Sequence, residues 1–481
     1  MKNSEIKVFC RDLNRHGQAV CVEVNDDGEQ DNKTSVIFVD GLLMGESGFV
    51  EVVETLKNYR VARLSRRIDD SPDRVQMPCA IADDCGGCQI QALSYPASLR
   101  WKENSVRQTL ERIGTIDVES LVQPIIGASE PYTHYRNKMV YPVGSGAAGP
   151  ALGFYRARSH DLVTTPVCLI EPQSGARLRE LLPQLMVKHA ISAYDEKTHT
   201  GDLRFVTLRV SPTLGDGKSE KQMIILTSRV EKDAYFALAA DLLQEEDVVS
   251  VYLNIQAQRS NVILGNKFIL LGGDEQLTFT FDGNKFALSP GAFFQINYEQ
   301  TSKLYRLISS LVKDIHTEHS LSDIIDLYCG VGSIGLYVMN ELRKSSDAAL
   351  PHLLGLELIA EAVADAKQNA ELNAFAPDDY DFIRAAADES LAYITEADSE
   401  HTILILDPPR KGLDATLLSA LVEEGPSHLL YVSCNPATLA RDLKELTDVY
   451  DISLIQPVDM FPWTTHVEAV TLLTRNEVSC K

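Results

Sequence analysis

Apolar and polar positions follow two different patterns along this chain, and the change between them divides it. From about Asn284 onward, short apolar runs are separated by stretches in which apolar residues recur at helical spacing. The apolar runs are Ile324–Tyr328, Leu353–Leu358, Phe382–Ala386, Ile403–Leu406, Leu429–Val432 and Val467–Leu473, and the helical stretches include Ala360–Asn373, Asp414–Glu424 and Pro436–Leu446. This alternation predicts an α/β domain, in which helices cover both faces of a mainly parallel sheet. The connection between the final strands is too short for a long crossover helix, so we expect an antiparallel pair at the sheet edge.

A different pattern, of short strands between Gly- and Asp-rich turns, covers the N-terminal segment. It includes Ala19–Val24, Val36–Val39 and Gly48–Val53, and it predicts a small OB-like β-barrel. The next region mixes the helical stretch Ser98–Ile113 with strands such as Leu203–Val210 and Gln222–Thr227, which indicates an α+β fold. We therefore expect three domains, at residues 1–70, 71–283 and 284–481.

Length and composition narrow the class of protein. A chain of 481 residues exceeds one hydrophobic core, and its 44% hydrophobic content supports a packed globular protein. No apolar segment follows the charged start Met1–Glu5, and no run of about 18 apolar residues occurs, so we expect a cytoplasmic protein without membrane contact. Nine cysteines in such a chain are more typical of metal ligands, nucleophiles or core residues than of disulfides.

The charge of the chain is strongly acidic overall but basic in places. A formal net charge of −23 argues against an indiscriminate nucleic-acid binder, which needs Lys and Arg for phosphate contacts. Between Tyr132 and His160, however, there is no Asp or Glu. This stretch interleaves Arg136, Lys138, Arg156 and Arg158 with Tyr132, Tyr135, Tyr141, Phe154 and Tyr155, and a second basic run spans Lys57–Arg67. Cations beside stacking faces suit single-stranded RNA, although each run alone is also typical of a solvated face.

Cys434 lies where an apolar strand meets the start of a helical stretch. The run Leu429–Pro436 carries the strand directly into this thiol. A thiol at the carboxyl end of a strand faces the crevice where open α/β sheets bind ligands, and the following helix dipole is expected to favour its thiolate. We interpret Cys434 as a candidate nucleophile, while a lone cysteine in this position is more often inert and buried.

A Gly-rich loop follows the first strand of the same domain and opens a helix. Asp326–Gly335 has the context in which backbone groups approach a ligand closely. The spacing also suits a dinucleotide fold, and Glu357 at the end of the next strand is a ribose partner in either case. Asp326 before the glycines, together with Asp407 in a stiff Asp-Pro-Pro turn at a later strand end, favours S-adenosylmethionine.

These groups suit methyl transfer to C5 of uracil. That carbon is a poor nucleophile until a thiolate adds at C6, which Cys434 can supply. The methylated adduct must then lose its C5 proton to a base before the thiol leaves. Glu468, at the start of the last apolar strand, is the candidate base, although a glutamate in such a position is more often on the surface.

With these residues identified, the chain resembles the RNA uracil-C5 methyltransferase family, and specifically its iron-sulfur branch, which includes the 23S ribosomal RNA (uracil-5-)-methyltransferases. The resemblance covers nearly the whole length. It rests on five motifs in the family's order: Phe294–Asn297, Asp326–Gly332, Asp407–Arg410, Ser433–Pro436 and His466–Ala469. Any one of them is weakly specific, but the ordered set is highly specific.

The resemblance implies a role for each matching residue and a Rossmann-like S-adenosylmethionine-dependent methyltransferase domain. It implies that Cys434 is the nucleophile and Glu468 the proton acceptor. The positions that match contacts to the methyl donor or the pocket are Gln295, Tyr328, Ser333, Glu357, Asp388 and Asp407.

The resemblance also implies a metal cluster and an RNA partner. Cys79, Cys85, Cys88 and Cys168 match the four cluster ligands of the family, and four thiolates suit either zinc or an iron-sulfur cluster, which the resemblance makes [4Fe-4S]. The N-terminal barrel is similar to a TRAM domain. We therefore expect a monomer that methylates one uridine of 23S ribosomal RNA and binds neither DNA nor membrane.

Three other hypotheses are weaker on the sequence. The first is the same reaction on transfer RNA, in place of ribosomal RNA. The second is a non-catalytic RNA-binding assembly factor, which has no need of a thiol, a carboxylate and a cofactor loop at one sheet edge. The third is electron transfer, which only the four cysteines support. The acidity of the chain is unusual for an RNA enzyme, and a halophilic or marine source would explain it.

Overall fold

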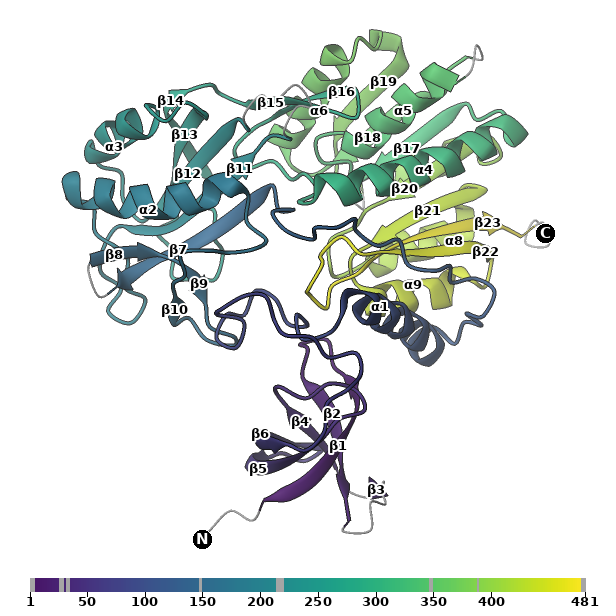
Figure 1. Ribbon diagram of the computed structural model, residues 1–481. Coiled ribbons are helices and arrows are strands. Elements are labelled where there is room, and N and C mark those ends of the chain that lie inside the picture. Colours follow the sequence, from purple (N-terminus) through teal and green to yellow (C-terminus); the bar gives the residue numbers. More distant parts are fainter. Residues whose placement is uncertain are drawn as a thin grey trace. The chain divides into compact units, whose positions relative to one another are not determined.

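The computed structural model describes residues 5–25, 30–31, 35–146, 149–212, 220–345, 349–386 and 389–476 (Figure 1). Its internal packing divides the chain into two compact units. The first comprises residues 1–104, 156–159 and 461–466, and the second comprises residues 105–155, 160–460 and 467–481. Among the described residues, no helix is long and apolar enough to cross a membrane.

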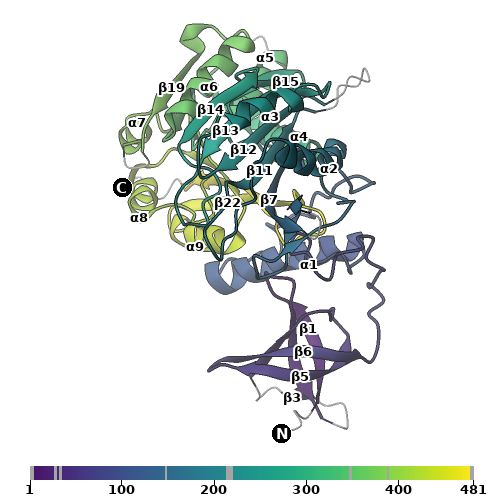
Figure 2. The same cartoon turned by 90° about the vertical axis from the view of Figure 1, so that its left-hand side faces the viewer.

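The first unit contains a small β-barrel, as the N-terminal pattern predicts. Its strands are β1 (Ile6–Leu13), β2 (Ala19–Val24), β3 (Gln30–Asp31), β4 (Val36–Val39), β5 (Ser47–Thr55) and β6 (Tyr59–Arg67). They follow the order β1-β5-β6-β4-β2-β3, and an additional β1–β2 pairing closes five of them into a barrel (Figure 2). Alternate strand residues such as Val8, Cys21 and Ile37 fill the barrel core, because successive side chains of a strand point to opposite faces.

The second unit contains a six-stranded sheet that corresponds to the expected α+β region. Its strand order is β14-β13-β12-β11-β7-β8. The strands are β7 (Lys138–Gly146), β8 (Gly149–Leu152), β11 (Leu203–Val210), β12 (Gln222–Ser228), β13 (Val248–Ile255) and β14 (Lys267–Gly273). Helices α2 (Gln173–Lys188) and α3 (Ala234–Leu242) pack on one face through residues such as Leu182 and Leu238. Two short strands, β9 (Phe154–Tyr155) and β10 (Leu162–Val163), pair separately.

The second unit also contains the predicted α/β sheet, with seven strands in the order β19-β18-β17-β20-β21-β23-β22. Its strands are β17 (Asp323–Leu327), β18 (His352–Glu357), β19 (Tyr380–Arg384), β20 (Thr402–Leu406), β21 (His428–Ser433), β22 (Tyr450–Val458) and β23 (Glu468–Arg475). The strands from β19 to β21 pair in parallel, whereas β21–β23 and β22–β23 are antiparallel. The predicted antiparallel edge is therefore confirmed. The chain reverses its direction of winding at β17, and such a switch point is where open α/β sheets bind ligands.

Helices cover both faces of this sheet. On one face, α8 (Ala415–Glu424), α9 (Pro436–Leu446) and the π-helical turn Leu110–Gly114 after α1 (Tyr95–Thr109) share one apolar core. On the other face lie α4 (Tyr298–His319) and α5 (Ser333–Ser345) (Figure 1). The remaining helices are α6 (Ala360–Leu372), α7 (Leu391–Thr395) and the 3₁₀ turn Pro377–Asp379.

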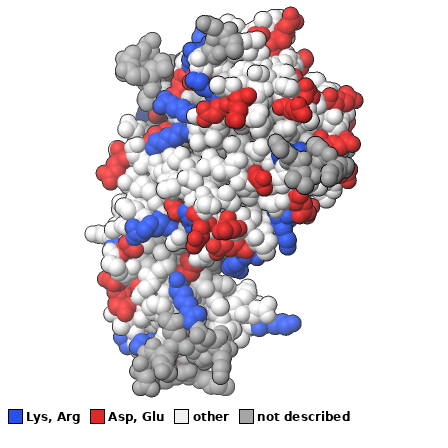
Figure 3. Space-filling view, turned by 90° about the vertical axis from the view of Figure 1, so that its right-hand side faces the viewer, with Lys and Arg blue, Asp and Glu red and all other residues white. Residues whose placement is uncertain are grey.

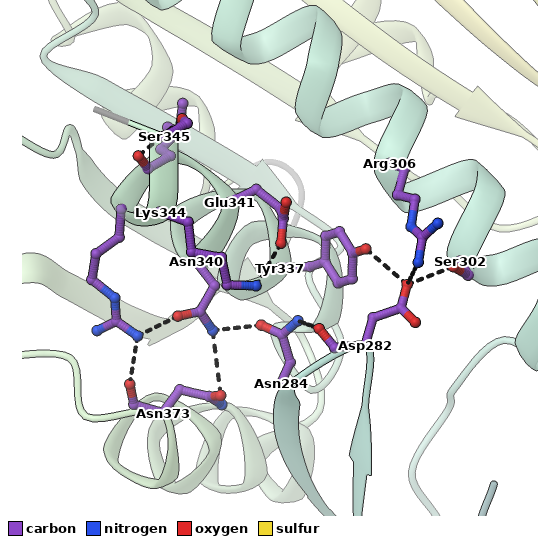
Figure 4. Close-up of polar contacts among 12 residues, drawn as sticks. Asp282, Asn284, Ser302, Arg306, Tyr337, Asn340, Glu341, Lys344, Ser345 and Asn373 are labelled. Carbon is purple, nitrogen blue, oxygen red and sulfur yellow. Dashed lines mark hydrogen bonds and ion pairs between the residues drawn. The ribbon is translucent and has the colours of Figure 1, made fainter. Parts of the chain in front are cut away.

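A polar network anchors the hairpin of β15 (Leu277–Phe281) and β16 (Asn284–Leu288) to α4 and α5 (Figure 4). Asp282 and Gly283 have φ values of +48° and +81°, as a type I′ hairpin turn requires. The Asp282 carboxylate accepts hydrogen bonds from the hydroxyls of Ser302 at 2.5 Å and Tyr337 at 3.0 Å, and it also pairs with Arg306. The turn is thereby held against two helices of the α/β sheet.

Two side chains of α6 and that of its C-cap residue Asn373 form hydrogen bonds with the backbone of β16 and the residue after it, in the place of a neighbouring strand. Because residues four apart lie on one face of a helix, Asp365, Asn369 and Asn373 form a row. These three side chains accept hydrogen bonds from the backbone N–H groups of Ser289 at 2.9 Å, Ala287 at 2.7 Å and Lys285 at 2.9 Å, respectively. These bonds fix the start of the segment that leads to Gln295.

Two members of the predicted basic-aromatic stretch form ion pairs within the first unit. Arg156 pairs with Asp84, and Arg158 pairs with Asp40 at 2.5 Å. The protein itself therefore partly compensates the charges of Arg156 and Arg158.

On the face of the molecule in Figure 3, acidic side chains gather in clusters and basic ones are scattered between them.

Candidate active site

The predicted catalytic residues lie at one end of two neighbouring strands. Cys434 directly follows β21, and Glu468 is the first residue of β23. These strands are antiparallel, and Ser433 is the register partner of Ala469. Cys434 and Glu468 are the next two residues in that register. The sheet therefore brings together two residues that are far apart in the sequence, at the edge where β17 and β20 also end.

The pKa of the Cys434 thiol is raised to about 11, mainly by burial and also by the carboxyl groups of Glu468 and Asp407, while the charge of Arg410 opposes the shift. The residue is half-buried. It precedes α9, whose N-cap Asn435 accepts a hydrogen bond from the Ala437 N–H at 3.2 Å. The prediction that the helix dipole favours the thiolate is wrong for the ligand-free protein. Loss of water around the sulfur is the largest cause of the shift, and it disfavours the charged thiolate.

Glu468 is almost fully enclosed, with 3% of its surface exposed. Burial raises the pKa of its carboxyl group well above the ordinary value, Asp407 raises it further, and Arg410 lowers it. Burial therefore favours the protonated form of this carboxyl group in the ligand-free site. Glu468 is therefore not on the surface, where a glutamate at the start of an apolar strand is more often found.

Asp407 follows β20 and is half-buried beside the same residues. Burial raises the pKa of its carboxyl group to about 7. The backbone carbonyl of Arg410, three residues later, accepts hydrogen bonds from the Asn435 side-chain amide at 3.0 Å and the Thr438 hydroxyl at 3.4 Å. The turn after Asp407 is thus fixed to the residue next to Cys434. Sequence reasoning missed Arg410 as a site residue, although it stands within the quoted motif.

The Gly-rich loop after β17 has the backbone that a close ligand contact needs. Tyr328, Gly330 and Gly332 have φ values of +67°, +56° and +73°. A Cβ atom on Gly332 would lie 2.9 Å from the ring of Phe382, so this position admits only glycine without rearrangement. Glu357, at the end of β18, accepts the Gly330 N–H at 3.1 Å and so holds the loop at the switch point.

Asp326 lies beneath this loop and was predicted only as part of the motif, not as a site residue. One carboxylate oxygen accepts the Gly335 N–H at 3.0 Å, while the other is buried without a hydrogen-bond partner. Burial raises the pKa of Asp326 to about 7, the Gly335 N–H opposes this shift, and the charges of Asp407 and Glu357 add to it. An unsatisfied buried oxygen beside a glycine loop fits a polar ligand with hydrogen-bond donors.

Of the three remaining residues that were predicted to contact the cofactor, the structure describes two, Ser333 and Gln295. Ser333 begins α5, and its hydroxyl lies 2.8 Å from that of Tyr305. Gln295 is 5% exposed, and its backbone carbonyl accepts the Asn137 side-chain amide at 2.8 Å. Asp388 lies outside the described residues.

The predicted metal ligands do not form a metal site within either unit. All eight described cysteines are thiols, so none of them forms a disulfide. Cys79, Cys85 and Cys88 belong to the first unit, and Cys168 belongs to the second. Within the described ranges, no group of three or more Cys, His, Asp or Glu side chains is placed to hold a metal ion.

Comparison with known proteins agrees with the chemistry of this edge. The family model of tRNA (uracil-5-)-methyltransferases matches residues 218–476. RNA methyltransferases of Halalkalibacterium halodurans and Bacillus cereus (strain ATCC 10987) are both 36% identical to the chain, over 475 and 482 residues. These alignments cover 98% and 99% of this chain, and 97% and 98% of the relatives.

A solved structure of similar fold also covers the chain. It is the crystal structure of Pyrococcus abyssi tRNA (uracil-54, C5)-methyltransferase in complex with S-adenosyl-L-homocysteine, which is 27% identical to this chain. The TM-score is 0.72, over 98% of this chain and 100% of that one.

Alkylation of Cys434 tests the electrostatics of the site. Only the thiolate reacts with iodoacetamide, so with a pKa of about 11 the rate should rise about tenfold per pH unit from pH 7 to pH 10. Asp407→Asn should speed the reaction and Arg410→Met should slow it, since these charges respectively raise and lower the pKa of Cys434. The measurement is mass spectrometry of the peptide that contains Cys434. A rate that is already constant above pH 8 would contradict the assigned shift.

Proposed function

This chain belongs to the tRNA (uracil-5-)-methyltransferase family, and from that premise we propose that it methylates C5 of one uridine in 23S ribosomal RNA. The family, and the relatives that cover nearly the whole chain, establish an S-adenosylmethionine-dependent RNA uracil-C5 methyltransferase. The proposal adds the RNA class and the roles of individual residues. The observation that carries these roles is the β21–β23 register, which sets Cys434 and Glu468 side by side.

In the proposed mechanism, the Cys434 sulfur adds to C6 of a uracil that is extruded from its RNA fold. The new C–S bond makes C5 nucleophilic, because the displaced electron pair is delocalised over C5 and the C4 carbonyl. The thiol begins protonated, so its proton must pass to water as the C–S bond forms. Arg410 supports this step, because its positive charge lowers the pKa of Cys434.

S-adenosylmethionine, when bound, supplies the electrophilic methyl group that C5 takes. The loop Asp326–Gly335 has the open backbone that fits such a ligand, beside the buried carboxylate of Asp326 and the partly exposed carboxylate of Glu357. We assign Gln295, Tyr328, Ser333, Glu357, Asp388 and Asp407 to the binding of the methyl donor or the framing of the pocket. A positive charge next to Asp407 and Glu468 would favour their ionised forms, since both pKa values are raised by burial.

Glu468 then takes the C5 proton, and the electron pair of the C5–H bond expels the Cys434 thiolate. Its raised pKa makes the ionised carboxylate a stronger base than an ordinary glutamate. This requires that the group lose its own proton after the ligands enter the site. In this mechanism Cys434 and Glu468 therefore both lose their protons only after the ligands have bound.

Two features support 23S ribosomal RNA over transfer RNA as the substrate. The chain has an N-terminal barrel, which we assign as a TRAM domain at residues 1–70, and it has the four cysteines of the iron-sulfur branch. The same reaction on transfer RNA is the second candidate, because the solved neighbour is named as a tRNA (uracil-54, C5)-methyltransferase. We retain the boundaries 71–283 and 284–481 for the other two domains, and a cytoplasmic monomer as the working form.

The four cysteines are proposed as ligands of a [4Fe-4S] cluster on the chemistry of the donors alone. All four are partly exposed thiols outside the hydrophobic cores, unlike the buried Cys10 and Cys21. Four thiolates fit an iron-sulfur cluster or zinc. Their arrangement does not form a metal site among the described residues, so no catalytic step is assigned to it.

A covalent complex with 5-fluorouridine RNA tests the catalytic roles. Fluorine at C5 cannot leave as a proton does, so the methylated adduct should persist and be seen by mass spectrometry. Cys434→Ala should abolish it. Glu468→Gln should trap an adduct even on ordinary RNA, because no base removes the C5 proton. The roles are wrong if the Cys434→Ala protein still forms the adduct.

A comparison of substrates tests the RNA class. With equal amounts of 23S fragments and transfer RNA, methyl transfer from radiolabelled S-adenosylmethionine should favour the 23S fragments by at least about tenfold, which equals roughly 1.4 kcal/mol of discrimination. Faster methylation of transfer RNA would reverse the assignment. It would leave the chemistry at Cys434 unchanged.

Anaerobic purification tests the metal. Iron and acid-labile sulfide should each approach four per chain, and Cys85→Ser should lower both. The matched control is Cys329→Ser, since Cys329 is buried in the Gly-rich loop after β17, away from the four proposed ligands in the sequence. One zinc per chain without acid-labile sulfide would contradict the iron-sulfur cluster and indicate a zinc site.

A further inference from the structure

Two cationic side chains face each other on one side of the second unit's six-stranded sheet. Lys138 on β7 and Arg209 on β11 are direct register partners in antiparallel strands, so both point to the same face. Their neighbours Met139 and Leu208 pack into the core on the α2 and α3 side, so the two cations occupy the opposite face. Arg209 is 1% exposed, and Lys138 is half-buried.

No carboxylate forms an ion pair with either cation in the part of the chain that the structure describes. Arg209 donates one hydrogen bond, to the backbone carbonyl of Ala292, and its Nε has no partner. Asp365 acts on Arg209 electrostatically, but its oxygens accept hydrogen bonds from Ser289 and Gln276. Burial and the charge of Arg209 lower the pKa of Lys138 to about 7.

This arrangement is costly for the protein alone. Like charges directly opposite on one sheet face destabilise it, and a buried cation without a carboxylate loses its hydration without compensation. A third cation, Arg136, lies two residues before Lys138, just ahead of β7. Its Nε is also buried without a hydrogen-bond partner. In a chain of net charge −23, none of these three cations forms an ion pair among the described residues, whereas Arg156 and Arg158 do.

The cluster lies next to the segment that enters the candidate active site. Between Arg136 and Lys138, the Asn137 backbone N–H donates to the Ile296 carbonyl at 2.8 Å, and its side chain donates to the carbonyl of Gln295 at 2.8 Å. Arg209 binds the same segment through Ala292. An anion at Lys138 would therefore lie beside the backbone that carries Gln295.

We propose that Lys138 binds a backbone phosphate of the substrate RNA close to the target uridine, with Arg209 behind it as a buried charge that strengthens the site. The inference rests on the proposed RNA methyltransferase function and deepens it. An RNA phosphate supplies the negative charge that the described protein lacks here. Lysine suits this contact because its ammonium is a compact charge that needs no fixed orientation of the phosphate.

The first arm of the test measures RNA binding by the full chain as a function of salt, without the methyl donor. Lys138→Met should weaken binding roughly tenfold and reduce the slope of log affinity against log salt by about one phosphate contact. Lys138→Arg should retain most of both. Lys313→Met, at an exposed position of α4, is the matched control for loss of one charge and should change neither.

The second arm locates the phosphate. Oligonucleotides that carry a single neutral methylphosphonate near the target uridine should include one position that weakens wild-type binding as much as Lys138→Met does. The same methylphosphonate should cost the Lys138→Met protein little more, because the partner is already gone. If every methylphosphonate weakened binding as much in the Lys138→Met protein as in the wild type, Lys138 would not contact the RNA backbone.

The outcomes separate this inference from the proposed function. If the wild-type protein methylates RNA but Lys138→Met leaves the salt slope and the methylphosphonate response unchanged, the phosphate site is wrong and the enzyme assignment stands. If the wild-type protein methylates no RNA, the function itself fails. Circular dichroism and unfolding of Lys138→Met should match the wild type, and if that variant is unfolded the Lys138→Arg and methylphosphonate data decide.

Discussion

The exclusion of water from carboxyl groups at one edge of the α/β sheet is the constraint on which the active site depends. Asp326 and Glu468 are almost fully buried there, and the half-buried Asp407 acts electrostatically on both of them and on Cys434. Burial disfavours each charged form, so all three pKa values rise and the thiol is held protonated beside them. Burial therefore shifts these groups of the ligand-free site toward their neutral forms, and a cationic methyl donor would favour the ionised carboxylates.

Much of the fold could be predicted because the relevant signals are local. The helix Pro436–Leu446 was predicted with its observed ends, since Asn435 caps it and proline fits its first turn. The proximity of Cys434 and Glu468 depends instead on the register of two antiparallel strands; the chemistry of the reaction and the family resemblance called for it, but the local pattern could not supply that register. The direction of the Cys434 pKa shift was predicted wrongly, because the helix dipole is visible in the sequence and desolvation is not.

The same distinction applies to charge. The sequence grouped Arg156 and Arg158 with Lys138 in one basic run, but the first two belong to the first compact unit and Lys138 belongs to the second. The first two have acidic partners from distant segments, whereas Lys138 is opposite another cation. Net charge and local runs therefore said little about which cations are available to RNA. Partners that arrive from other parts of the chain decide this.

The protonation state of Glu468 tests the central claim most directly. Infrared difference spectra of the ligand-free wild type against Glu468→Gln at pH 7 should contain the carbonyl band of a protonated carboxylic acid, which the variant lacks. The band should persist to clearly higher pH than an ordinary glutamate allows, because burial raises the pKa of this group. A carboxylate band in its place at pH 7 would show that Glu468 is already ionised, and that burial does not set the charge of this site.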